Sequence, residues 1–135
     1  ETRRVMGDYV ITAEELAAGK RFDDVIVHKA EFIVDIHNPA GAGQAESKIQ
    51  YVKPYDLPYR CFVPRHIENL YVAGRCISGT HRAHASYRVM SICMAMGEAV
   101  GIAASLCAKK KCTPRTLDVH ELQNCMTSKG IDLFS

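Results

Sequence analysis

The densest group of residues that could do chemistry lies at positions 71–101, which read YVAGRCISGTHRAHASYRVMSICMAMGEAVG. An apolar, strand-like run ends at Gly74, a polar turn follows, and a long stretch rich in small residues predicts a helix. A helix N-terminus offers unpaired N–H groups and the positive end of a dipole, which favour phosphates or electron-rich carbonyl groups. Arg75 and Arg88 would add positive charge nearby. The pattern predicts a cofactor or anion site, although similar strand-turn-helix units also occur without a ligand.

The sequence supports a metal site or a reactive thiol less well than it supports the cofactor or anion site. His81 and His84 are three residues apart, but no carboxylate or thiol at a fitting spacing completes a metal site, so we expect none. The six cysteines include no C-x-x-C pair and are expected to be reduced thiols that pack as small apolar residues. Arg75 and a helix start could activate Cys76, but a packing role is favoured because no partner cysteine is near it in sequence.

The composition of the chain is that of a folded domain. Its 135 residues are 47% hydrophobic and 24% charged, with a formal net charge of +2, which is ordinary for one globular domain and argues against disorder. The positive residues are scattered apart from three lysines at 109–111, so we expect no nucleic-acid partner. The chain begins ETRRVMGDYV, without an initiator Met or a leader, and we expect a cytoplasmic piece of a longer protein.

Apart from one long helix, the elements that must position the turn are short. Residues 3–12 predict a strand, and a helix should follow with Thr12 as its N-cap, Glu15 completing a capping box, and Gly19 ending it. Residues 23–37 predict two strands or one bent strand, and residues 44–65 predict irregular structure and short strands because they contain prolines. A short strand is expected at 68–74 and a helix at about 88–111. A last helix should begin after Asp118 and end before Gly130.

The long helix could also be interpreted as a membrane span. Its segment 89–107 carries a single charge, and Gly97 and Gly101 have G-x-x-x-G spacing. However, Glu98 would lie near the centre of the bilayer, where insertion is costly, and the many small residues lower the hydrophobicity. We therefore expect no membrane span, and a buried helix in an α/β core.

Nearly the whole chain resembles the C-terminal part of the FAD-dependent oxidoreductase family, the glutathione-reductase-like flavoproteins. The resemblance is strongest in NLYVAGRCIS at 69–78, TH at 80–81, RVM at 88–90 and MAMGEAVG at 94–101. Weaker matches are DIHNPAG at 35–41, YDLPYRCFVP at 55–64 and CTPRTLDVHELQ at 112–123. The resemblance implies an α/β fragment that completes part of a Rossmann-like FAD domain. Residues 1–65 would be a substrate-side segment, and residues 66–135 the strand-loop-helix part of the FAD-binding domain.

The resemblance also implies site residues. Contacts with the pyrophosphate and ribityl chain of FAD would come from the turn, at Gly74, Arg75, Cys76, Ile77 and Ser78. The start of the helix would meet the flavin pyrimidine edge through backbone N–H groups, at Ala95, Met96, Gly97 and Glu98. His81 and Arg88 are candidates beside the isoalloxazine or substrate, and Arg88 is also a cofactor-binding candidate. Glu98 stands where the family commonly has Gln, and its carboxylate would repel a reduced flavin unless it is protonated or turned away.

The chain lacks the fingerprint that binds the ADP half of FAD. That fingerprint is a G-x-G-x-x-G turn between a strand and a helix, and the nearest match, GAGQAE at 41–46, has neither context. We therefore expect a C-terminal fragment of an enzyme that transfers a hydride between a small-molecule substrate and FAD. The fragment alone should be inactive and without FAD, its partner should be the rest of the parent chain, and its exposed apolar surface should promote self-association. The alternative is a non-catalytic binding or assembly module that uses the small-residue helix as an interface.

Overall fold

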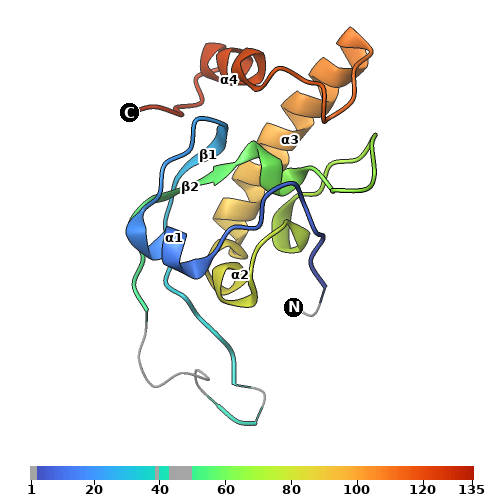
Figure 1. The fold of residues 1–135 in the computed structure, drawn as a ribbon. Coiled ribbons are helices and arrows are strands. Elements are labelled where there is room, and N and C mark those ends of the chain that lie inside the picture. Colours follow the sequence, from blue (N-terminus) through green and yellow to red (C-terminus); the bar gives the residue numbers. More distant parts are fainter. Residues whose placement is uncertain (1–2, 39, 43–49) are drawn as a thin grey trace.

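The order of elements confirms a mixed α/β fold (Figure 1). The structure is a computed structural model and describes residues 3–38, 40–42 and 50–135. Most of the GAGQAE segment therefore lies outside the described residues. The helices and strands within the described part of the chain are α1 (Ala13–Ala18), β1 (Val25–Ala30), β2 (Tyr55–Pro58), α2 (His81–Tyr87), α3 (Met90–Lys110) and α4 (Val119–Ser128), with 3-10 turns η1 (Tyr59–Phe62) and η2 (Gly74–Cys76).

The helix ends form where the local sequence predicts them. At α1, the Thr12 hydroxyl accepts a hydrogen bond from the Glu15 N–H, and the Glu15 carboxylate accepts one from the Thr12 N–H. Gly19 then ends the helix in the left-handed conformation, with φ of 66°. At α4, the Asp118 carboxylate accepts from the His120 N–H. These caps depend only on residues within one helical turn, which is why the sequence predicts them.

The strands differ more than the helix ends do from those that the sequence predicts. β1 and β2 pair antiparallel, with Val25 opposite Pro58, and two irregularities in register interrupt the ladder. The strand expected at 3–12 is wrong, because that segment makes only isolated bridges, Gly7 with Pro64 and Ile11 with Gly79. The strand expected at 68–74 is also wrong, since residues 70–73 pair with no strand in the described part of the chain and Gly74 begins η2. An apolar run becomes a strand only where a second backbone edge is available to pair with it.

Residues 77–88 contain a helix that the sequence analysis did not predict. Thr80 caps α2 by accepting a hydrogen bond from the Ala83 N–H, and five of the seven helical residues are buried. The long helix α3 then begins at Met90, close to the expected start, with Val89 as its N-cap. In place of the polar turn expected before the long helix, the chain forms η2, a short buried link at residues 77–79, and α2.

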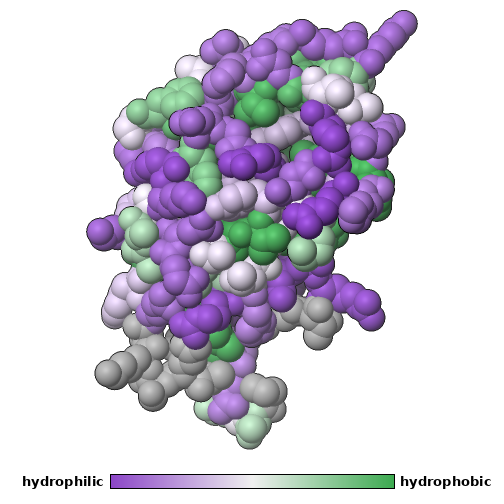
Figure 2. All heavy atoms as spheres, viewed as in Figure 1, coloured by the Kyte–Doolittle hydropathy of each residue, from purple (hydrophilic) through white to green (hydrophobic). Residues whose placement is uncertain are grey.

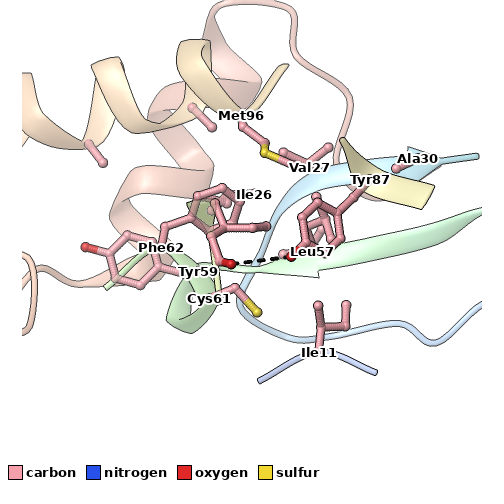
Figure 3. Packing of buried hydrophobic residues seen from close by; sticks show 14 of the residues in the cluster. Ile11, Ile26, Val27, Ala30, Leu57, Tyr59, Cys61, Phe62, Tyr87 and Met96 are labelled. Atoms are coloured by element: carbon pink, nitrogen blue, oxygen red, sulfur yellow. Dashed lines mark hydrogen bonds between the residues drawn. The ribbon is translucent and has the colours of Figure 1, made fainter. Parts of the chain in front are cut away.

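The core forms between the sheet and one side of α3. Figure 3 shows Met96 of α3 among side chains from β1, β2 and η1. The α3 residues that face the core are Ile92, Met96, Ala99, Ala103 and Cys107. By length and composition α3 is the one helix among the described residues that could cross a membrane. Only 28% of its apolar stretch is buried, so the buried helix expected from the sequence is wrong for most of its surface. The face of the molecule in Figure 2 is mostly hydrophilic with small hydrophobic areas.

Buried polar side chains join segments that are far apart in the sequence. The Asp56 carboxylate is 2% exposed and accepts hydrogen bonds from Arg21 Nη1 at 2.7 Å and from His28 Nδ1 at 2.9 Å. The buried Gln123 side chain of α4 donates to the carbonyl oxygens of Asp23 at 2.7 Å and Val25 at 3.1 Å. Through this amide, α4 is held against the start of β1.

Replacement of Gln123 by Leu should destabilise the protein. It leaves the carbonyl groups of Asp23 and Val25 without their donor, a loss of about 1–3 kcal/mol in the free energy of unfolding. Urea unfolding followed by circular dichroism measures this loss. The matched control is Asn124→Ala at the neighbouring exposed position of α4, which should change stability by less than about 0.5 kcal/mol. Equal stabilities of the two variants would show that the amide does not hold α4 in place.

Replacement of Gly79 by Ala should also destabilise the protein. A Cβ at position 79 would lie 2.7 Å from the Tyr87 hydroxyl oxygen and 3.1 Å from a methyl group of Ile11. Tyr87 and Ile11 are fully buried, so relief requires the core to shift, at about 1–3 kcal/mol. Gly41→Ala is the control, because a Cβ there meets nothing within 4 Å. A Gly79→Ala protein with the thermal midpoint of the control would contradict this packing.

Candidate functional site

The turn at Gly74 packs directly against α3. Gly74 has φ of 74°, a conformation that favours glycine, and its N–H donates to Met96 Sδ at 3.2 Å. A Cβ at Gly74 would lie 3.8 Å from Cys93 Sγ, so the backbone of the turn rests on the second turn of the helix. The structure thus brings together Gly74 and Met96, two of the residues that the resemblance assigned to the cofactor.

The residues that follow Gly74 face in different directions. The side chain of Arg75 is exposed, and Cys76 is half-buried with its thiol donating to the Ala73 carbonyl oxygen at 3.3 Å. Ile77 and Ser78 are fully buried, and the Ser78 hydroxyl oxygen has no hydrogen-bond partner among the described residues. Of this turn, Arg75 is the most accessible to a ligand, and Gly74 and Cys76 are partly accessible.

The start of α3 lies earlier than the expected flavin contact. Val89 caps the helix without any side-chain hydrogen bond, so the free N–H groups of the first turn belong to Met90, Ser91 and Ile92. The N–H groups at 95–98 lie inside α3, where they bond to carbonyl groups of the preceding turn. The N–H groups at Ala95–Glu98 are therefore already bonded within α3, and the expected contact of these residues with a flavin stays a prediction.

The four residues at positions 95–98 of α3 differ in their exposure to solvent. Met96 is fully buried and Ala95 is half-buried, whereas Gly97 and Glu98 are exposed. A Cβ at Gly97 would meet nothing within 4 Å, and the same is true at Gly101, one turn further along. Met94 is 74% exposed on the preceding turn. α3 therefore presents a face with little side-chain bulk at its glycines, on which a flat group or another backbone could lie closely.

Arg88 belongs to a polar cluster that the sequence analysis did not identify. Its Nη2 donates to the Asp35 carbonyl oxygen at 3.0 Å, and lies 3.3 Å from Asp35 Oδ2 and 2.9 Å from His37 Nε2. His37 Nε2 is also 3.2 Å from Asp35 Oδ2, so this nitrogen either accepts from Arg88 or donates to Asp35, according to its protonation. The DIH sequence at 35–37 resembles a segment of the family, and this resemblance is the feature of the sequence that could have identified Asp35 and His37 as site residues.

His81 lies apart from that cluster. It is the first residue of α2 and is exposed, whereas Arg88 caps the other end of the same helix. His84 is 1% exposed, and its ring lies edge-on to Tyr87 with 5.6 Å between centroids. The two histidines of the T-H-R-A-H sequence are thus in different environments. Within the described part of the chain, no three His, Cys, Asp or Glu side chains gather closely enough to hold a metal ion.

The thiols beside the turn are not activated. Burial raises the pKa of Cys93, which the positive charge of Arg75 only partly opposes. Burial also raises the pKa of Cys61, the buried cysteine behind the turn, to about 12. Both groups are protonated at neutral pH, which fits the packing role expected for these cysteines.

Comparison with known proteins identifies the family. The model of the FAD dependent oxidoreductase family matches residues 1–126, which include the Gly74 turn, α2, α3 and most of α4. No curated protein and no solved structure matched the chain. The matched region is far more than half of the sequence and contains every candidate site residue described above. The chain therefore belongs to the FAD-dependent oxidoreductase family.

Proposed function

We propose that this chain forms the flavin-side part of an enzyme that transfers a hydride between a small-molecule substrate and FAD. The observation that carries the proposal is the contact between the Gly74 turn and α3, next to an uncapped helix start, in a chain of this family. The dinucleotide fingerprint is absent from the sequence. We therefore infer that the rest of a longer parent chain supplies it within a Rossmann-like FAD domain.

The residues present fit an anionic, flat cofactor. Gly74 lacks a side chain at an accessible turn, and the exposed Arg75 adds a positive charge next to it, which suits phosphate groups. The first N–H groups of α3, at Met90, Ser91 and Ile92, need acceptors from outside the helix. The electron-rich carbonyl groups of a flavin pyrimidine ring would satisfy them, and the helix dipole would favour negative charge there by about 0.3–1 kcal/mol.

The bound FAD would supply the hydride chemistry, and the protein would supply orientation and electrostatics. The Arg88, Asp35 and His37 cluster gives the chain a polar group beside the start of α3, on the side that we assign to the substrate. Asp35 holds the Arg88 guanidinium in place, while the His37 side chain is 64% exposed. Since Arg88 and Asp35 engage Nε2, His37 could exchange a proton with a bound substrate through Nδ1, and Arg88 could orient an anionic substrate.

The isolated chain should not retain FAD. It lacks the segment that holds the ADP half, so excess FAD added to the purified chain should be removed by desalting, as the visible flavin absorption will show. The same measurement on a version extended upstream to a G-x-G-x-x-G turn should give a flavin band in near-equal ratio to protein. A persistent band with the isolated chain would show that the chain binds FAD unaided and would overturn the need for a parent chain.

Gly97→Val should weaken FAD binding in the full-length parent enzyme. The branched side chain would project from the open face of α3, and we expect at least about tenfold weaker binding, or ~1.4 kcal/mol. Ala108→Val is the matched control, since it places the same side chain at an exposed position near the other end of α3. FAD content measured after gel filtration should fall in Gly97→Val alone. Full FAD content in both variants, with altered self-association in Gly97→Val, would instead support an assembly interface.

A further inference from the structure

The C-terminal end of α3 brings two cysteines together. Lys111 ends the helix in the left-handed conformation, with φ of 55°, and the Cys112 N–H donates to the Cys107 carbonyl oxygen at 3.1 Å. In this kind of helix cap, the side chains at these two positions commonly contact each other as an apolar pair. Here both are cysteines, and both line the same groove. The backbone of the cap thus places the two thiols at the pair of positions whose side chains commonly meet.

The two thiols differ in accessibility. Cys107 is 6% exposed, and its sulfur lies 3.3 Å from the Tyr71 hydroxyl. Cys112 is half-buried and follows the exposed lysines at 109–111, whose positive charges favour an anionic reagent. Both cysteines line one groove, whose other walls include Leu70, Val100 and Pro114. Cys112 is therefore the thiol that a reagent in the groove would meet first, with Cys107 behind it.

We propose that Cys107 and Cys112 form a reversible dithiol–disulfide pair that reacts with small-molecule disulfides. The Cys112 thiolate attacks one sulfur of the small disulfide, whose other half leaves as a thiolate and takes up the proton that Cys112 lost. Cys107, as its thiolate, then attacks the Cys112 sulfur of this mixed disulfide and expels the second small thiol, which takes up the proton from Cys107. The pair loses two electrons, and the small disulfide is reduced to two thiols.

This site is separate from the proposed flavin site. Cys107 lies seventeen positions after Met90 along one continuous helix, which corresponds to roughly 25 Å at the rise of an α-helix. The proposal therefore requires no electron transfer to or from FAD and does not rest on the proposed function. A disulfide here would cross-link the last turn of α3 to the segment that leads into α4.

Burial sets the order of the two steps. It raises the pKa of Cys107, and the hydrogen bond from Tyr71 opposes that rise. Cys107 is thus the poorer first nucleophile, and becomes the attacking group only after Cys112 has formed a mixed disulfide beside it. The cysteines at the turn, Cys76 and Cys93, lie near the other end of α3 and take no part in this step.

The test is oxidation of the reduced, purified chain by glutathione disulfide, followed by alkylation of the remaining thiols and peptide mass mapping. We expect one internal cross-link between Cys107 and Cys112, a loss of two hydrogen atoms, while the half-buried Cys125 of α4 is alkylated. Cys107→Ser should stop at a stable glutathione adduct on Cys112, and Cys112→Ser should react at least about tenfold more slowly. Cys125→Ser is the matched control and should form the cross-link at the normal rate.

Three results would overturn the proposal. The first is a folded wild-type chain that gives no Cys107–Cys112 cross-link at equilibrium with glutathione disulfide. The second is a Cys107→Ser chain in which glutathione modifies Cys112 no faster than Cys125. The third is a cross-link that appears only after urea unfolding, which would show that the native cap keeps the sulfur atoms apart. Circular dichroism of each variant before oxidation ensures that only folded protein is compared.

Discussion

The close packing around Gly79 determines how the chain passes through the candidate site. Gly79 pairs with Ile11, and its missing side chain leaves room for the Tyr87 ring, whose hydroxyl donates to the Ile77 carbonyl oxygen. The next residue, Thr80, both caps α2 and donates its N–H to the Ile11 carbonyl oxygen at 2.9 Å. Because Gly79 is small, the N-terminal segment, the buried link and the end of α2 can pack against one another. This packing positions Arg88 and the start of α3, which follow α2 directly.

Backbone hydrogen bonds from two distant segments hold the Gly74 turn and the buried link after it in place. The Val5 N–H donates to the Cys76 carbonyl oxygen at 2.9 Å, and the Ser78 N–H donates to the Cys61 carbonyl oxygen at 3.0 Å. With Ile77 fully buried between these contacts, the turn has little freedom to move. A turn that meets a cofactor benefits from such support, because orientation is then provided before binding. The N-terminal segment acts here as a structural support, although it forms no continuous strand.

α3 connects two regions with different chemistry. At its first turn no side chain caps the helix, which leaves N–H groups for an electron-rich partner. At its last turn the backbone cap is complete, and Cys107 and Cys112 occupy the two positions that it joins by a hydrogen bond. Between them, Met96 and Ala99 pack on the core while Gly97 and Gly101 leave the opposite face open. The core, the proposed cofactor contact and the proposed thiol pair therefore use different turns or faces of the same helix.

The sequence by itself determined the features that depend on neighbouring residues. The capping box of α1, the Asp118 cap of α4, the long small-residue helix and the family resemblance could all be read from it, because a cap needs partners only three or four positions away. Only the tertiary structure decided which apolar runs became strands, that α2 forms, and that Asp35 and His37 meet Arg88 across more than fifty residues. Strand pairing and buried polar contacts need distant partners, and periodicity within one segment does not specify those partners.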